Sequence, residues 1–174
     1  MGQALPKVGL RPFLPADVSI LAAIFATSVE GLTDDDYSEA QREAWAGVAD
    51  DEEKLGQRLA SQLTLVATLQ SSPVGFVSLK GADHLDMLYV HPAAARQGVA
   101  SALCDAIEKL AAARGAAHIT VDSSDTAEPF FFRRGYVGES RNTVTVGDEW
   151  LANTTMKKTF VGSAPQGEQT GSAS

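Results

Sequence analysis

Apolar residues recur every three to four positions in two stretches of the chain, and this spacing predicts amphipathic helices. The first stretch covers residues 18–29 and follows Pro15, while the second covers residues 99–110 and precedes Gly115, a common helix terminator. The apolar positions are Val18, Leu21, Ala22, Phe25 and Val29 in the first, and Val99, Leu103, Ala106, Ile107 and Leu110 in the second. Residues 36–48 and 52–61 predict two further helices. One face of the helix over residues 36–48 carries Tyr37, Gln41, Ala44, Trp45 and Val48.

Runs of β-branched and other apolar residues predict strands between these helices. The strands are expected at residues 8–11, 63–69, 74–79, 84–90 and 118–121, followed by a hairpin of residues 142–146 and 150–157. Residues 126–133 predict a short helix. Together these elements predict one α/β domain over residues 1–160. Residues 161–174 are small, polar and free of aromatic residues, and we expect them to be disordered.

Composition narrows the class of protein. The 174 residues are 44% hydrophobic and 21% charged, which fits a soluble globular domain with a sizeable core. No segment resembles a secretory signal or a membrane span, and the only cysteine, Cys104, cannot form an internal disulfide. We therefore expect a cytoplasmic protein with no membrane partner, in which Cys104 is a buried small hydrophobe. The net charge of −8 argues against a nucleic-acid partner, because such proteins must neutralise phosphates.

The negative charge is concentrated in residues 30–54, which contain ten acidic residues against Arg42 and Lys54. This segment therefore carries the whole formal net charge of the chain. It is either a solvated helical surface or a negative field near a site that receives cationic substrates. The acidic residues are Glu30, Asp34, Asp35, Asp36, Glu39, Glu43, Asp50, Asp51, Glu52 and Glu53.

Residues 88–103 combine a strand that ends at His91-Pro92, a basic loop with one glycine, and the start of an amphipathic helix. The first amides of a helix lack internal partners, and the helix dipole is positive there, so such an end can bind an anion. Gly98 allows close approach of the backbone, and Arg96 adds a positive charge. The alternative is an ordinary strand-to-helix loop with a surface arginine, and the residues alone leave both readings open.

Two blocks of sequence resemble the GNAT superfamily of acetyl-CoA-dependent N-acetyltransferases. The first is Leu-Tyr-Val-His-Pro at residues 88–92 with the loop and helix start that follow, and the second is Ala-Glu-Pro-Phe-Phe-Phe-Arg-Arg-Gly-Tyr at residues 127–136. The resemblance implies an α/β (α+β) fold with a mixed, largely antiparallel sheet that is flanked by helices and splayed open at the cofactor cleft. The chain departs from the family pattern at Ala95, where a basic or amide residue is usual, and at Phe131, where many members have tyrosine.

The resemblance also implies where acetyl-CoA binds. The pantetheine arm follows the strand edge at Leu88 and Val90, the backbone amide of Tyr89 or Val90 polarises the thioester carbonyl, and the pyrophosphate meets the loop before the second long helix. The implied cofactor-binding residues are Leu88, Tyr89, Val90, Arg96, Gln97, Gly98, Val99, Ala100, Ser101, Ser124 and Phe131. The resemblance implies no metal.

Proton transfer needs a base for the amine and an acid for the departing thiolate. His84 and Asp86 lie two residues apart on one face of a strand, and either is a candidate base. Because Phe131 replaces the usual tyrosine, the acid is one of Tyr37, Tyr136 and Ser124, or water. Tyr136 is alternatively a core aromatic residue.

The acceptor side is predicted on the helix over residues 36–48, where Tyr37, Gln41 and Trp45 are the candidate acceptor contacts. Trp45 is alternatively a core residue.

The expected function is transfer of an acetyl group to a small-molecule or peptide amine, by direct attack in a ternary complex. A degenerate acyl-CoA-binding domain that acts as a sensor is the alternative, and a homodimer is compatible with both.

Overall fold

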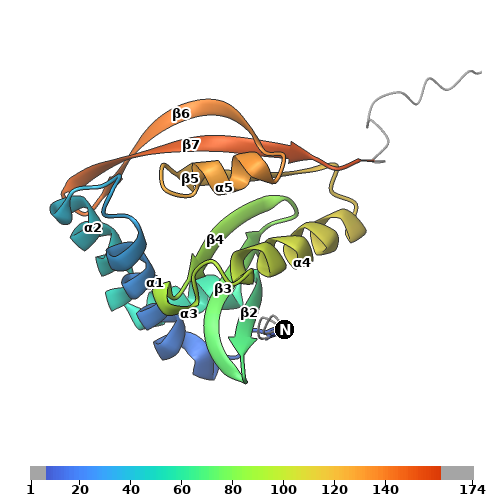
Figure 1. Cartoon of the computed structure of the whole chain (residues 1–174), viewed down its shortest axis with the longest axis horizontal. Helices are drawn as coiled ribbons and strands as arrows, with labels where there is room; N and C mark the ends of the chain where they lie inside the picture. Colours follow the sequence, from blue (N-terminus) through green and yellow to red (C-terminus); the bar gives the residue numbers. More distant parts are fainter. Residues whose placement is uncertain (1–6, 162–174) are drawn as a thin grey trace, which may run out of the picture.

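The computed structural model describes residues 7–161, which form one seven-stranded sheet flanked by helices (Figure 1). The strand order is β1-β2-β3-β4-β5-β7-β6, and every neighbouring pair is antiparallel except β4 and β5. The strands are β1 Val8–Pro12, β2 Leu63–Leu69, β3 Ser72–Lys80, β4 His84–Val90, β5 His118–Ser124, β6 Val137–Val146 and β7 Glu149–Thr159. The expected mixed, largely antiparallel sheet is confirmed. The tail predicted to be disordered lies outside the described residues, apart from Val161.

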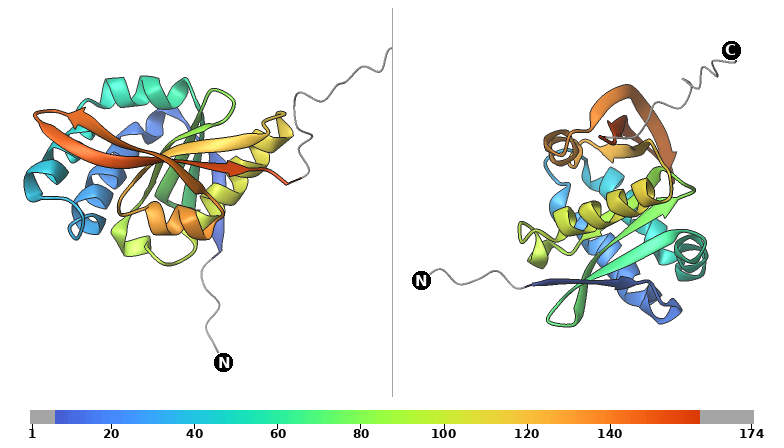
Figure 2. Two further views of the ribbon diagram at one scale, coloured as in Figure 1. Left: turned by 90° about the horizontal axis from the view of Figure 1, so that it is seen from above. Right: turned by 90° about the vertical axis from the view of Figure 1, so that its right-hand side faces the viewer.

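The sheet splits between its two parallel strands. β4 and β5 pair only at His84↔Thr120 and Leu85↔Val121, and beyond these positions they diverge. The register of β4 against β3 shifts from Leu79↔Leu85 to Ser78↔Met87, so Asp86 is an extra, bulged residue. Because a bulge bends and twists its strand, the one at Asp86 favours divergence just past the last β4–β5 pair. The expected opening of the sheet is therefore confirmed, and Figure 2 shows the two parts from above.

Within residues 7–161, five α-helices cover the two faces of the sheet. They are α1 Val18–Leu32, α2 Glu39–Ala46, α3 Glu52–Ala60, α4 Val99–Ala113 and α5 Glu128–Arg133. Three 3-10 turns accompany them, at Pro15–Asp17, Gly47–Asp50 and Pro92–Ala94. The helix predicted over residues 36–48 is shorter than expected: Ser38 caps α2 by accepting a hydrogen bond from Gln41 N, so the helix begins at Glu39. Tyr37 consequently lies in the preceding segment and not on the face of α2.

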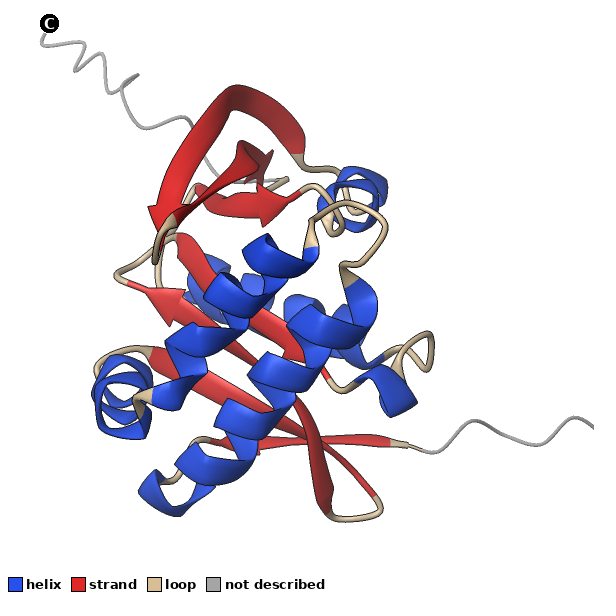
Figure 3. Ribbon diagram, turned by 90° about the vertical axis from the view of Figure 1, so that its left-hand side faces the viewer, coloured by secondary structure: helices blue, strands red, loops and turns tan. Residues whose placement is uncertain are grey.

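Within the described residues, two hydrophobic cores lie on opposite faces of the sheet. Figure 3 shows the helices packed beside the strands. On β3, Phe76 belongs to the core under α1 and α3, while its neighbour Val77 belongs to the core under α4, and both are fully buried. A strand covered on both faces becomes a nearly continuous apolar run, as β3 is. The α4 core includes Leu85 of β4 and Val121 of β5, so α4 joins the two parts of the split sheet.

Within residues 7–161, the stretch Pro15–Leu32 is long and apolar enough to cross a membrane, with 18 residues and a mean hydropathy of 1.3. Its apolar positions Leu21, Ile24 and Phe25 are at most 2% exposed and pack against the sheet. No such stretch was expected from the sequence, but a core helix passes the same length and composition test, so the stretch is only weak evidence for a membrane span.

Candidate functional site

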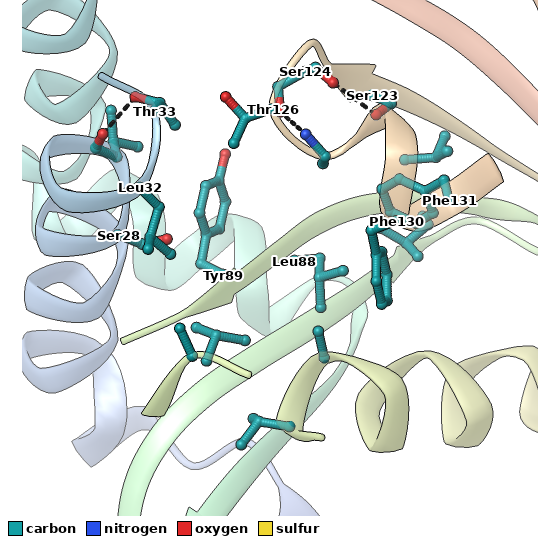
Figure 4. Close-up of a pocket in the computed structure, with 18 of the residues that line it drawn as sticks. Ser28, Leu32, Thr33, Leu88, Tyr89, Ser123, Ser124, Thr126, Phe130 and Phe131 are labelled. Carbon is teal, nitrogen blue, oxygen red and sulfur yellow. Dashed lines mark hydrogen bonds between the residues drawn. The ribbon is translucent and has the colours of Figure 1, made fainter. Parts of the chain in front are cut away.

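A cleft of about 400 Å³ occupies the gap between β4 and β5 (Figure 4). Side chains from α1, β4, β5 and α5 and the loop before α4 converge on it. They include Ser28, Leu32, Thr33, Leu88, Tyr89, Ser124, Thr126, Phe130 and Phe131. Beyond Leu85, β4 has β3 on one side and no paired strand on the other. Its backbone edge at residues 86–90 can therefore hydrogen-bond an extended ligand in the cleft.

The loop before α4 forms a cradle at one end of this cleft. Gly98 is the N-cap of α4 with φ +79°, and because glycine has no side chain to cap the helix, the first amides of α4 keep their hydrogen-bonding capacity. A Cβ at Gly98 would meet nothing within 4 Å, which leaves this backbone open to an approaching anion. Arg96 has φ +63°, and both Arg96 and Arg133 line the cleft. The residues present therefore fit a pyrophosphate.

A second hollow, of about 160 Å³, lies on the other side of the opening, between Tyr37 and Trp45 and the β6–β7 hairpin. Val144, Leu151 and Asn153 form its hairpin wall. Four residues line both cavities, namely Trp45, Tyr89, Asp122 and Ser124. The two cavities therefore meet at one junction, which a cofactor on one side and a second substrate on the other can both reach.

The junction is aromatic on its β4 side. Trp45 Nε1 donates a hydrogen bond to the Tyr89 hydroxyl at 3.2 Å, and the two rings are 6.4 Å apart in an edge-on arrangement. Burial raises the pKa of Tyr89 to about 12, so its hydroxyl keeps its proton at neutral pH. The sequence pointed only to the backbone of Tyr89. Its side chain became a functional candidate only once the structure placed it beside Trp45.

Comparison with known proteins decides the family. A family model described as an acetyltransferase (GNAT) domain matches residues 33–160. The chain belongs to the GNAT acetyltransferase family. It is 35% identical over 151 residues to the uncharacterized N-acetyltransferase YafP of Escherichia coli (strain K12), an alignment that covers 87% of this chain and 95% of that protein. The resemblance inferred from residues 88–103 and 127–136 is thereby confirmed.

Solved GNAT structures superpose on this chain. A GCN5-related N-acetyltransferase from Rhodopseudomonas palustris has a TM-score of 0.88 and 59% identity, covering 92% of this chain and 99% of that one. The PaiA N-acetyltransferase from Thermoplasma acidophilum, solved with coenzyme A, has a TM-score of 0.73 and 20% identity, covering 88% and 99%. The second likeness supports the GNAT fold.

The two candidate bases of this GNAT domain differ in their surroundings. Asp86 accepts hydrogen bonds from Arg58 at 2.7 and 2.9 Å and from Gln62 at 2.8 Å. Burial acts to raise the pKa of Asp86, but these hydrogen bonds outweigh it and the net pKa is lowered. His84 has Nδ1 at 2.8 Å from Thr120 Oγ1, and its ring is partly exposed. A carboxylate with a lowered pKa is a poor proton acceptor, although Asp86 lines the cleft. His84 lines neither cavity, and its Nε2 lies 3.8 Å from Oδ2 of Asp122, which lines both.

The three candidate acids also differ in their burial and in their hydrogen-bond partners. The Tyr37 hydroxyl donates to Ala152 O at 2.8 Å and accepts from Asp125 N at 2.9 Å, which ties the segment before α2 to β7 and the end of β5. Tyr136 is fully buried and its hydroxyl bonds Glu108 at 3.3 Å, as a core residue does. Ser124 Oγ lies at the cleft and accepts from Ala127 N at 3.1 Å.

The remaining predicted residues differ in whether they line a cavity. Gln41 lines neither cavity: its amide donates to Trp150 O at 2.7 Å and accepts from Ser38 N at 2.9 Å. Gln97 does not line the cleft and donates to Ala93 O at 3.1 Å. Phe131 lines the cleft and is 2% exposed, and Cys104 is buried, which raises the pKa of its thiol to about 12. Within residues 7–161, no three His, Cys, Asp or Glu side chains are grouped so as to hold a metal ion. The assignment of individual residues to acetyl-CoA or acceptor stays a prediction.

Proposed function

We propose that this GNAT domain transfers the acetyl group of acetyl-CoA to an amine by direct attack in a ternary complex. The observation that carries the proposal is the meeting of two cavities at Trp45, Tyr89, Asp122 and Ser124. One cavity has the helix N-terminus and the open strand edge that suit a phosphate-bearing, extended cofactor. The other has the β6–β7 hairpin as one wall and suits a separate acceptor.

Acetyl-CoA binds in the cleft between β4 and β5. The amides at the start of α4, together with Arg96 and Arg133, hold the pyrophosphate, because a helix N-terminus and guanidinium groups both stabilise negative charge. The pantetheine arm takes hydrogen bonds from the free edge of β4 at Leu88 and Val90. Phe131 and Phe130, whose rings are 5.2 Å apart, form an apolar wall beside it.

The bound thioester supplies a carbonyl carbon that the neutral amine nitrogen attacks. A C–N bond forms and the C–S bond breaks, with its electron pair leaving on sulfur, so the amine loses one proton and the thiolate gains one. The backbone amide of Tyr89 or Val90 stabilises the negative charge that develops on the carbonyl oxygen. No step requires a covalent acyl-enzyme, in keeping with the burial of Cys104.

His84 lines neither cavity but lies 3.8 Å from Asp122 at the junction, so it acts as the proton acceptor through water, and the Tyr89 hydroxyl is the proton donor. Tyr89 accepts a hydrogen bond from Trp45 and lines both cavities, so its own hydrogen remains available for donation at the junction. The raised pKa keeps the phenol protonated but makes it a weaker acid, so the assignment rests on the position of Tyr89 at the junction and not on its pKa. Tyr89 thereby supplies the hydroxyl that Phe131 lacks.

The experiment is an assay of free-thiol release from acetyl-CoA across polyamines, aminoglycosides, amino acids and peptides. Release that depends on the amine, with detection of the acetylated product, supports the proposal. Acetyl-CoA binding without transfer to any member of the panel refutes it and favours an acyl-CoA sensor. Phe131, which has no exchangeable proton, is the feature that favours the sensor.

A further inference from the structure

Asp122 occupies the point where the cofactor cleft and the second hollow meet. It is the first residue of β5 beyond the last β4–β5 pair, Leu85↔Val121, and therefore lies at the apex of the opening. Among the four residues that line both cavities, Asp122 alone carries a charge. Its side chain is 49% exposed, so its carboxylate is accessible from the cavities.

A network of polar side chains fixes the orientation of this carboxylate. Thr155 Oγ1 on β7 donates to Asp122 Oδ1 at 2.7 Å, and Asn142 Nδ2 on β6 donates to Thr155 Oγ1 at 2.7 Å. The other oxygen, Oδ2, lies 3.8 Å from His84 Nε2, which is too far for a hydrogen bond. One oxygen is therefore held by the sheet while the other can accept a hydrogen bond from a ligand.

Aromatic rings stand on the opposite side of the junction. Trp45 lies between Tyr37 and Tyr89 and contacts both rings edge to face, with 5.4 Å between its ring centre and that of Tyr37 and 6.4 Å to that of Tyr89. Aromatic faces attract cations, and a carboxylate accepts charge-assisted hydrogen bonds from them. A carboxylate that shares a small hollow with three such rings is suited to an ammonium group.

The other acidic groups nearby are already engaged. Asp86 is paired with Arg58, and Asp125 is paired with Arg141. The ten acidic residues of the segment 30–54 line neither cavity in the described structure, and Asp36 accepts a hydrogen bond from Thr126. The negative charge that directly lines the junction is therefore that of Asp122, and the acidic segment contributes no lining residue.

We propose that Asp122 holds the protonated amine of the acceptor at the junction and selects the class of acceptor, an inference that rests on the proposed function. The preferred acceptor is a primary amine on an uncharged or cationic carbon skeleton. A carboxylate on the carbon next to the nitrogen faces Asp122 and is repelled, so α-amino acids are poor acceptors. Asp122 is a positioning and specificity residue, because it acts on binding and not on the bonds that change.

The test measures binding directly and needs no turnover. Calorimetry titrates butylamine, butan-1-ol and norvaline, which is butylamine with an added α-carboxyl group, into the CoA-saturated protein. For the wild type we expect butylamine to bind at least about tenfold more tightly than either analogue. Asp122→Asn is expected to weaken butylamine binding about tenfold or more, with unchanged affinity for CoA.

Asp83→Asn is the matched control. Asp83 lies in the turn before β4, its side chain is 46% exposed and lines neither cavity, and it is paired with His118 at 3.3 Å. This variant loses the same charge and should bind butylamine as the wild type does. Equal losses in both variants overturn the proposal, because they indicate a general electrostatic effect.

Two further results overturn it: norvaline binding the wild type as tightly as butylamine, or no measurable binding of butylamine to the wild type. Both comparisons use the wild-type protein, so they decide the matter even if Asp122→Asn fails to fold. Failure of the proposed acetyl transfer gives a different result from failure of the Asp122 proposal. In that case butylamine binds in an Asp122-dependent manner but no acetyl group is transferred from acetyl-CoA.

Discussion

Replacing Gly98 by glutamate tests the cofactor cradle most directly. The substitution puts a carboxylate at the N-terminus of α4, in a space where a Cβ meets nothing within 4 Å. At about 4 Å from a phosphate charge, an effective dielectric constant of about 20 gives a repulsion of roughly 4 kcal/mol. That energy corresponds to about a thousandfold in affinity. Because salt screens exposed charges, we expect CoA to bind at least about thirtyfold more weakly.

The backbone cost of the same substitution requires a control. Gly98 has φ +79°, and a side chain in this left-handed region costs about 1–2 kcal/mol. Gly115 lies just after the other end of α4 with φ +95°, and a Cβ there also meets nothing within 4 Å. Gly115→Glu therefore carries a similar strain and the same charge away from the cradle. Both variants should melt about 2–8 °C lower than the wild type.

Isothermal titration calorimetry measures the affinity for CoA of the wild type, Gly98→Glu and Gly115→Glu. Gly115→Glu should bind CoA as the wild type does, and Gly98→Glu should not. If folded Gly98→Glu keeps wild-type affinity, the pyrophosphate does not lie against this helix end and the cofactor placement is wrong.

Three more substitutions probe the junction and the fold. Tyr89→Phe removes the proposed acid and should lower kcat about tenfold or more while CoA affinity is kept; an unchanged kcat contradicts the assignment. Tyr37→Phe removes the hydroxyl that bonds Asp125 N and a β7 carbonyl, so thermal unfolding should show a loss of about 1–3 kcal/mol. Asp17→Asn tests pH dependence, because hydrogen bonds from Arg11 lower the pKa of Asp17 below 3.8. Its destabilisation should be full above about pH 4 and should fade as acid protonates the wild-type carboxylate, and a loss independent of pH contradicts this.

The sequence anticipated those parts of the site that are contiguous along the chain. The loop and helix start at residues 91–101 are a local strand–loop–helix pattern that hydrophobic spacing predicts, while a cofactor role for the loop came only from the resemblance to the GNAT superfamily. The start of α2 was also readable, because Ser38 and Gln41 form a capping box with a recognisable spacing, and overlooking it misplaced Tyr37 on the helix.

The junction between the cavities could not be predicted from local sequence patterns. Trp45, Tyr89 and Asp122 come from α2, β4 and β5, and only the divergence of two strands brings them together. The strand predicted to end at residue 121 continues to Ser124, which placed Asp122 outside the predicted element. The pairing of Asp86 with Arg58 likewise depends on how α3 packs against the sheet.

β6 has one face toward the second hollow and little of its surface in the protein interior. Its residues are exposed along most of the strand, and within the described chain none of them joins either hydrophobic core. Val144 and Val146 nevertheless form part of the wall of the second hollow, the proposed acceptor site. Changes at these two positions can reshape that wall at little cost in folding free energy. The acceptor range of this domain can therefore diverge, in evolution or by engineering, while the cofactor half is left intact.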